Sequence, residues 1–178
     1  MQMSPAMLQQ LLNRPAEALA VIRGSEQYPA LSGEVWFFPL WGGTLVAAEV
    51  TGLPSAGMRS CAPGIHGFHI HEGGSCSQGS DPSQPFPDTL AHYNPRQCPH
   101  PGHAGDLPPL FGNDGYAFQI FYTDQFVPEE VIGRTVVIHS SVDDFTSQPA
   151  GNSGSKIACG RIISPLQTAA DEAGTSSK

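Results

Sequence analysis

The chain has 178 residues, of which 39% are hydrophobic and only 13% are charged. Its 20 glycines and 17 prolines break helices, which argues against a helical bundle and favours short strands joined by turns. Eight Lys and Arg against 16 Asp and Glu give a net charge of −8, the wrong sign for a protein that binds nucleic acid or an anionic membrane. No segment approaches the roughly 18 apolar residues that a membrane span requires.

The N-terminal residues predict a short helix on the outside of one medium-sized domain. Ser4 is suited to the N-cap, Pro5 to the first helical position, and residues 13–15 end the helix. A helix that binds a partner or a second copy is the alternative. The segment lacks the basic start and long apolar stretch of a secretory signal, so a cytoplasmic location is expected. The apolar residues of the helix form a single stripe: Met7, Leu8, Leu11 and Leu12.

Short segments rich in β-forming residues follow, and two long stretches, 73–110 and 140–155, show no regular pattern. Loops of that length inside a compact domain are usually functional. Seven or eight strands with two long loops predict an all-β sandwich or Greek-key barrel. The domain is expected over 18–165, after a helical extension at 1–17 and before a flexible tail at 166–178. The predicted strands are 18–23, 33–39, 43–51, 64–71, 116–123, 135–139 and 156–163.

Histidine is the residue type that stands out, with seven copies. His69 and His71 are two apart on a predicted strand, so both rings leave the same face and can chelate one metal ion. His66 is an odd number of positions from both and is interpreted as a structural histidine. His139 ends another strand, where its side chain can face a neighbouring loop.

The first long loop contains a second set of candidate ligands. Three imidazoles and one carboxylate suit a closed zinc site, which could organise a loop that has no hydrophobic core. Any single histidine is more often a hydrogen-bonding residue than a ligand, but the clustering favours a metal site. The set consists of His92, His100, His103 and Asp106.

The four cysteines contain no CxxC pair, which argues against a zinc ribbon or a thioredoxin-type redox motif. Their spacing is compatible with two disulfides, one or none. They lie at Cys61, Cys76, Cys98 and Cys159.

In order and spacing, five segments resemble the copper/zinc superoxide dismutase family, and the resemblance covers about 18–163. It implies an eight-stranded antiparallel Greek-key barrel, an immunoglobulin-like sandwich. The segments are Gly67-Phe-His-Ile-His71-Glu, Ala91-His-Tyr-Asn-Pro95, His103-Ala-Gly-Asp-Leu107, Gly133-Arg-Thr-Val-Val-Ile-His139 and Gly151-Asn-Ser-Gly-Ser-Lys-Ile-Ala-Cys-Gly160.

The resemblance also implies copper and zinc as cofactors, with His92 bridging the two metals. Asp143 would link a copper-bound histidine to a zinc-bound one, and Asp144 beside it is interpreted as a loop or capping residue. Cys76 and Cys159 match the family's disulfide, whereas pairing of the other two cysteines stays open. The implied copper ligands are His69, His71, His92 and His139, and the implied zinc ligands are His92, His100, His103 and Asp106.

The implied activity is that of an oxidoreductase that converts superoxide to O₂ and H₂O₂ by redox cycling of copper. His92 would carry a proton, and Lys156 stands where the family usually has an arginine that guides the anion. Lysine keeps the charge but loses the fork of donors, so a working but slower enzyme is expected. The alternatives are a module that holds zinc or carries copper without turnover, and an interaction domain that docks through its N-terminal helix. A monomer or a homodimer is expected.

Overall fold

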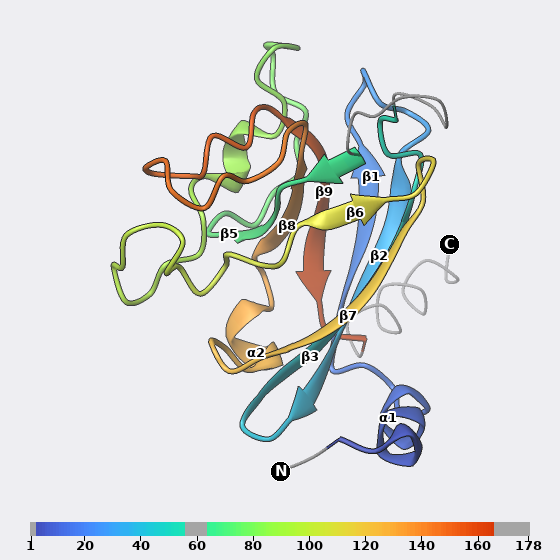
Figure 1. Ribbon diagram of the computed structural model, residues 1–178. Helices are drawn as coiled ribbons and strands as arrows, with labels where there is room; N and C mark the ends of the chain where they lie inside the picture. Colours follow the sequence, from blue (N-terminus) through green and yellow to red (C-terminus); the bar gives the residue numbers. More distant parts are fainter. Residues whose placement is uncertain (1–2, 56–63, 166–178) are drawn as a thin grey trace, which may run out of the picture.

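The computed structural model describes residues 3–55 and 64–165, and this part of the chain is built mainly of antiparallel strands (Figure 1). Two short α-helices and one 3₁₀ turn, Pro87–Thr89, complete it. The helices are α1 (Pro5–Leu12) and α2 (Pro128–Val131). The strands are β1 (Ala18–Gly24), β2 (Ser32–Leu40), β3 (Gly43–Thr51), β4 (Gly64–His66), β5 (Phe68–His71), β6 (Leu110–Gly112), β7 (Ala117–Thr123), β8 (Thr135–His139) and β9 (Lys156–Ile163).

Seven strands form one curled sheet in the order β5-β8-β9-β1-β2-β3-β7, and β4 pairs with β6 in a separate ribbon (Figure 1). The last strand, β9, lies between β8 and β1, so the ends of the domain meet inside the sheet. This arrangement confirms the predicted antiparallel all-β barrel.

The expected strand 64–71 is divided in two at Gly67, which is a difference from the prediction. Gly67 donates its N–H to the carbonyl of Ser141 and accepts the N–H of His139, so its backbone bonds go to the loop after β8 and to the end of that strand. A Cβ at this position would come within 2.9 Å of Ser153. The close approach requires glycine, and the chain passes here from the β4–β6 ribbon into the main sheet.

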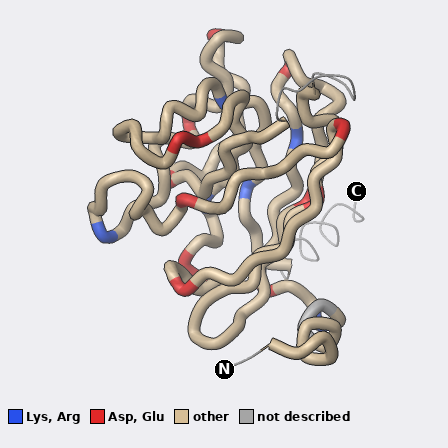
Figure 2. The backbone as a smooth tube through the Cα atoms, viewed as in Figure 1, with Lys and Arg blue, Asp and Glu red and all other residues tan. Residues whose placement is uncertain are grey.

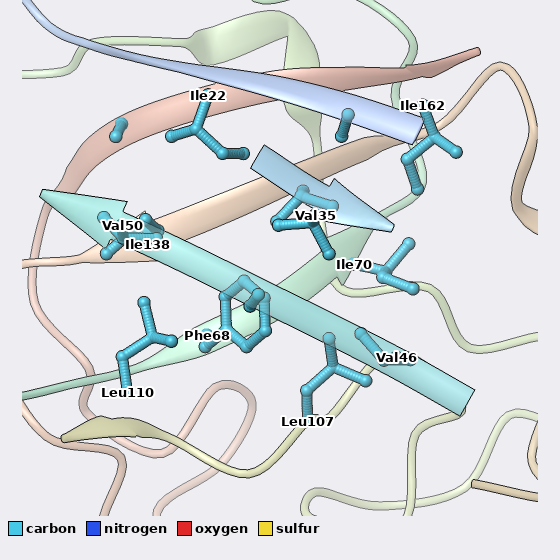
Figure 3. Packing of buried hydrophobic residues seen from close by; sticks show 14 of the residues in the cluster. Ile22, Val35, Val46, Val50, Phe68, Ile70, Leu107, Leu110, Ile138 and Ile162 are labelled. Atoms are coloured by element: carbon cyan, nitrogen blue, oxygen red, sulfur yellow. The ribbon is translucent and has the colours of Figure 1, made fainter. Parts of the chain in front are cut away.

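The core lies inside the curled sheet and follows the alternation of the strands (Figure 3). On β5, Phe68 and Ile70 point into this core, and on β8 so does Ile138. The alternate residues, His69 on β5 and Val137 on β8, lie on the other face. Each fully buried side chain of this kind contributes about 1.5–3 kcal/mol. The same strands therefore anchor the core on one face and present histidines on the other.

Helix α1 lies outside the barrel, as the sequence predicts (Figure 1). The hydroxyl of Ser4 accepts the N–H of Met7 at 3.2 Å, which caps the helix. Leu8 packs against a small outer cluster that includes Phe38 and Leu45. Among the described residues, no helix is long and apolar enough to cross a membrane.

Cys76 and Cys159 form a disulfide that ties the loop after β5 to strand β9, which confirms the predicted pair. Cys98 is a half-buried free thiol. Cys61, the other cysteine whose pairing the sequence left open, lies outside the described residues. In the described part of the chain the few Lys and Arg residues are scattered, with no basic cluster (Figure 2).

Candidate metal centre

Two adjoining groups of side chains could each hold a metal ion, and they share His92. Within each group, one donor atom per residue lies within 4.8 Å of all the others. The first group is His69, His71, His92 and His139, and the second is His92, His100, His103 and Asp106. The structure therefore brings together every ligand that the sequence suggested.

Backbone pairing explains how these distant residues meet. His69 and His71 sit on β5, which pairs with β8, the strand that His139 ends. Isolated bridges join His71 to His92 and His69 to Asp106, so the long loop after β5 folds back along that strand. All of these histidines are buried. A rigid sheet thus positions one half of the centre and a returning loop supplies the other.

In the first group the ring nitrogens of His71 and His139 face each other, with 3.3 Å between their Nε2 atoms. Two imidazoles bound to one ion at about 2.0–2.1 Å in tetrahedral geometry would have their nitrogens about 3.3 Å apart. The rings of His69 and His92 lie 4.0 Å apart, centroid to centroid. The spacing of the first group is therefore that of ligands gathered around a single ion.

The outward nitrogen of each strand-borne histidine is anchored by a hydrogen bond. His69 donates from Nε2 to Asp143 at 2.7 Å, and His71 donates from Nδ1 to the carbonyl of Leu90 at 2.9 Å. His139 donates from Nδ1 to the carbonyl of Gly154 at 3.3 Å. Bonds of this kind fix the tautomer and leave the opposite nitrogen free as a ligand.

The second group gathers around the carboxylate of Asp106. Nδ1 of His92 and Nδ1 of His103 lie 2.8 and 3.2 Å from its Oδ1, and Nδ1 of His100 lies 3.0 Å from its Oδ2. Burial raises the pKa of Asp106, but the hydrogen bond from His92 and the surrounding histidines outweigh burial and hold the pKa below its usual range. Asp106 is therefore an anionic ligand at neutral pH, which suits a divalent cation.

Within 3–55 and 64–165, three buried side-chain nitrogens make no hydrogen bond: Nδ1 of His69, Nε2 of His92 and Nδ1 of His100, the last being close to Asp106 without hydrogen-bond geometry. Unpartnered polar atoms are costly in a protein interior, and all three belong to the two groups. Burial also lowers the pKa of His71, and lowers that of His139 to about 3, so both rings are neutral and carry a free lone pair at neutral pH. The residues present therefore fit metal ions at both positions.

Asp143 joins the two groups. Its carboxylate accepts from Nε2 of His69 at 2.7 Å and from Nε2 of His100 at 2.9 Å, and it also accepts the N–H of Phe145. Burial raises the pKa of Asp143, but these hydrogen bonds, led by that from His69, hold it well below its usual range. The position agrees with the sequence expectation. Asp144 instead accepts from the backbone N–H groups of Thr146 and Ser147, as a loop-capping residue does.

His66 occupies a different environment, as its predicted structural role requires. Its Nδ1 lies 3.0 Å from the carbonyl of His139, and its Nε2 lies 3.2 Å from that of Pro54. Both ring nitrogens thus face backbone carbonyls, and His66 belongs to neither group.

Two supporting residues were missed by sequence reasoning. Gln148 holds the backbone of His100 from both sides, donating to its carbonyl at 2.7 Å and accepting its N–H at 3.1 Å. Gly151 has φ +65°, and a Cβ there would meet the Asp143 carboxylate at 1.9 Å and His100 at 2.7 Å. Gly151 begins one of the resembling segments, but only the fold shows that its missing side chain makes room for this hydrogen bond.

A cavity of about 650 Å³ opens onto the centre. Its lining residues include His71, His92 and His139 of the two groups, together with Lys156. An anion entering from solvent can thus reach the first group past a single cationic side chain.

Fold and centre together define a class: an antiparallel β-barrel enzyme with two adjacent, histidine-rich metal sites. The family described as copper/zinc superoxide dismutase matches residues 31–162. The chain belongs to that family, and its cofactors are copper and zinc.

Named relatives agree with this assignment. A "Superoxide dismutase [Cu-Zn]" of Deinococcus radiodurans is 36% identical over 76% of this chain and 79% of the relative. An "Extracellular superoxide dismutase [Cu-Zn]" of Drosophila melanogaster is 33% identical over 86% and 88%.

Two solved structures share the fold. The Cu/Zn superoxide dismutase from Brucella abortus has a TM-score of 0.66 at 26% identity, covering 82% of this chain and 99% of that one. The clock protein EA4 also has a TM-score of 0.66, at 32% identity, covering 84% and 94%.

Proposed function

We propose that this chain is a superoxide dismutase in which the first group holds copper, the second holds zinc and His92 bridges them. The observation that carries the assignment is the ring of His92. Its Nδ1 lies 2.8 Å from Asp106 in the second group, while its Nε2 is buried without a partner beside the rings of the first. One imidazole thus offers a nitrogen to each group.

The balanced reaction takes two superoxide anions and two protons to O₂ and H₂O₂. Copper supplies the one-electron redox chemistry, and imidazole ligands suit it. His92 supplies a proton site at Nε2, because Nδ1 stays engaged with the second group. His92 lines the cavity, so a proton held on its ring would lie close to an anion that enters there.

Lys156 attracts the substrate anion into this cavity. Its charge acts on His71 and His139, since the ammonium helps lower the pKa of both rings after burial and the neighbouring histidines. A cation that lines the cavity raises the local concentration of a small anion despite the net charge of −8.

Reconstitution tests the proposal. Protein loaded with copper and zinc should bind one equivalent of each and consume superoxide catalytically. Stoichiometric binding of both metals without superoxide consumption would instead identify a metal-holding module.

A pair of substitutions separates the two sites. His139→Ala removes a ligand of the first group only and should abolish dismutation and copper binding while zinc binding persists. His103→Ala, the matched change in the second group, should weaken zinc binding first. Loss of zinc from the His139→Ala protein, with its fold retained, would contradict the assignment. Metal content by mass spectrometry and circular dichroism are the measurements.

The cytoplasmic location, the domain boundaries and the choice between monomer and homodimer stay predictions. Sedimentation of the metal-loaded protein distinguishes one copy from two. Cell fractionation tests the location.

A further inference from the structure

Lys156 is enclosed by hydrogen-bond acceptors. Its Nζ lies 2.7 Å from Oγ1 of Thr89, 3.2 Å from the carbonyl of Phe86 and 3.4 Å from that of Leu90. A lysine ammonium has three protons, and three acceptors are present. The cation therefore acts on an incoming anion through its charge, with its own donors already engaged.

Thr89 makes the shortest of the three bonds and is fully buried. Its hydroxyl donates to the carbonyl of Phe86 at 2.8 Å, so the proton of Oγ1 is already used and a lone pair points to Nζ. Among the three acceptors, only this one is a side chain. Its geometry thus depends on the identity of residue 89.

The backbone on either side of Thr89 also contacts the Lys156 ammonium. Phe86 and Leu90, which flank the 3₁₀ turn, both have positive φ, 58° and 61°. Neither is glycine, and such conformations persist where surrounding contacts impose them. The carbonyls of these two residues are the ones that accept from Lys156, and that of Leu90 also accepts from Nδ1 of His71.

We propose that Thr89 is a positioning residue for the reaction: its hydroxyl holds the Lys156 ammonium at the cavity wall, where its charge faces His71 and His139. The proposal rests on the proposed function for the role of Lys156. The contact between the two side chains is independent of that function.

A double-mutant cycle measures the role of Thr89 on the metal-loaded enzyme. Thr89→Val keeps the shape but loses the acceptor, and should lower the second-order rate constant for superoxide and the affinity for azide, a small anion, about threefold to fivefold. Thr89→Ser restores the acceptor and should recover both. In a Lys156→Met background, Thr89→Val should change neither quantity further, because the cation it positions is gone.

Amine labelling supplies a readout that needs no superoxide. The chain has two lysines, Lys156 and Lys178, so each sample contains its own reference. Acetic anhydride at limiting dose, followed by peptide mapping, should label Lys156 several-fold faster relative to Lys178 in Thr89→Val than in the wild type. Thr89→Ser should label like the wild type.

Each outcome decides the matter. If Thr89→Val lowers the rate constant and the azide affinity equally with and without Lys156, then Thr89 only stabilises the loop and the proposal is overturned. Unchanged labelling of Lys156 would overturn it as well. If the wild type binds metals without consuming superoxide, the proposed function fails, while the azide and labelling results still decide whether Thr89 positions the cation.

Discussion

Asp143 and Asp144 are adjacent carboxylates with unlike partners. Asp143 is buried between His69 and His100, whereas Asp144 is exposed and bonds only within its own loop, to Thr146 and Ser147. The two neighbouring residues therefore have different roles: Asp143 orients a histidine in each of the two groups, and Asp144 caps a turn.

This contrast predicts the result of two matched substitutions. Asp143→Asn should lower zinc affinity about tenfold to a hundredfold, because the rings of His69 and His100 lose the carboxylate that orients them. Asp144→Asn should leave zinc affinity unchanged. Competition with a chromophoric chelator measures both, and equal effects in the two variants would refute the role of Asp143.

Lys156 gives the second prediction at this scale. An arginine has five donors, so it can satisfy the acceptors around Nζ and still offer a fork to the anion. Lys156→Arg should therefore raise the rate constant for superoxide, measured at fixed ionic strength. No change or a fall would contradict the expectation.

The same residue predicts a pH dependence. Burial lowers the pKa of Lys156 from its ordinary value of 10.5. The ammonium attracts superoxide below that pKa and the neutral amine does not, so the rate should fall as pH rises through it, beginning at a lower pH than for an exposed lysine. Lys156→Arg stays charged and should lose this alkaline decline.

At the scale of elements, the first loop depends on a few attachments to the sheet. The disulfide from Cys76 to Cys159 fixes its start against β9. Arg134 lies over the ring of Tyr93 at 3.9 Å and pairs with Glu72 at 2.7 Å, which secures the segment that follows His92. These contacts add to the buried packing that the loop itself supplies through Phe86, Tyr93 and Leu107.

Removing the disulfide should therefore destabilise the fold. Cys76→Ser with Cys159→Ser opens a link across a sequence separation of 83, which corresponds to about 4 kcal/mol of unfolded-state entropy. Denaturant unfolding of the metal-loaded protein measures the loss. Cys98→Ser serves as the control and should change the free energy of unfolding little, because Cys98 is a free thiol.

At the scale of the whole molecule, the core and the metal centre share strands but lie on opposite faces. Phe68, Ile70 and Ile138 build the core, while His69, His71 and His139 face the loops. We therefore expect the barrel to persist without metal and the loops to depend on it.

Metal removal tests this division. Chelation should leave the strand signal in circular dichroism intact but lower Tm by about 10 °C, since ligand at a thousand times its Kd stabilises by about 4 kcal/mol. Complete loss of strand signal at room temperature would contradict the prediction.

Much of the ligand set could be read from the sequence because its spacing is local. His69 and His71 share a face through the strand period, and His100, His103 and Asp106 are close neighbours along the chain. The predicted strands agree with the structure for the same reason, except where 64–71 divides at Gly67. Short elements such as β6 and α2 were not predicted, because three or four residues carry too little periodic signal.

By itself, the sequence determined the class of fold, the candidate ligand residues and, through ordered motifs, the family. Only the tertiary structure showed which residues support the site. The hydroxyl of Thr89 accepts from Lys156, the amide of Gln148 donates to the carbonyl of His100, and Gly151 leaves space for the carboxylate of Asp143. Alternation and motif spacing are properties of neighbouring residues. The contacts of Lys156 with Thr89 and of Gln148 with His100 join residues 67 and 48 positions apart, so they depend on how distant segments meet, and no local pattern records that.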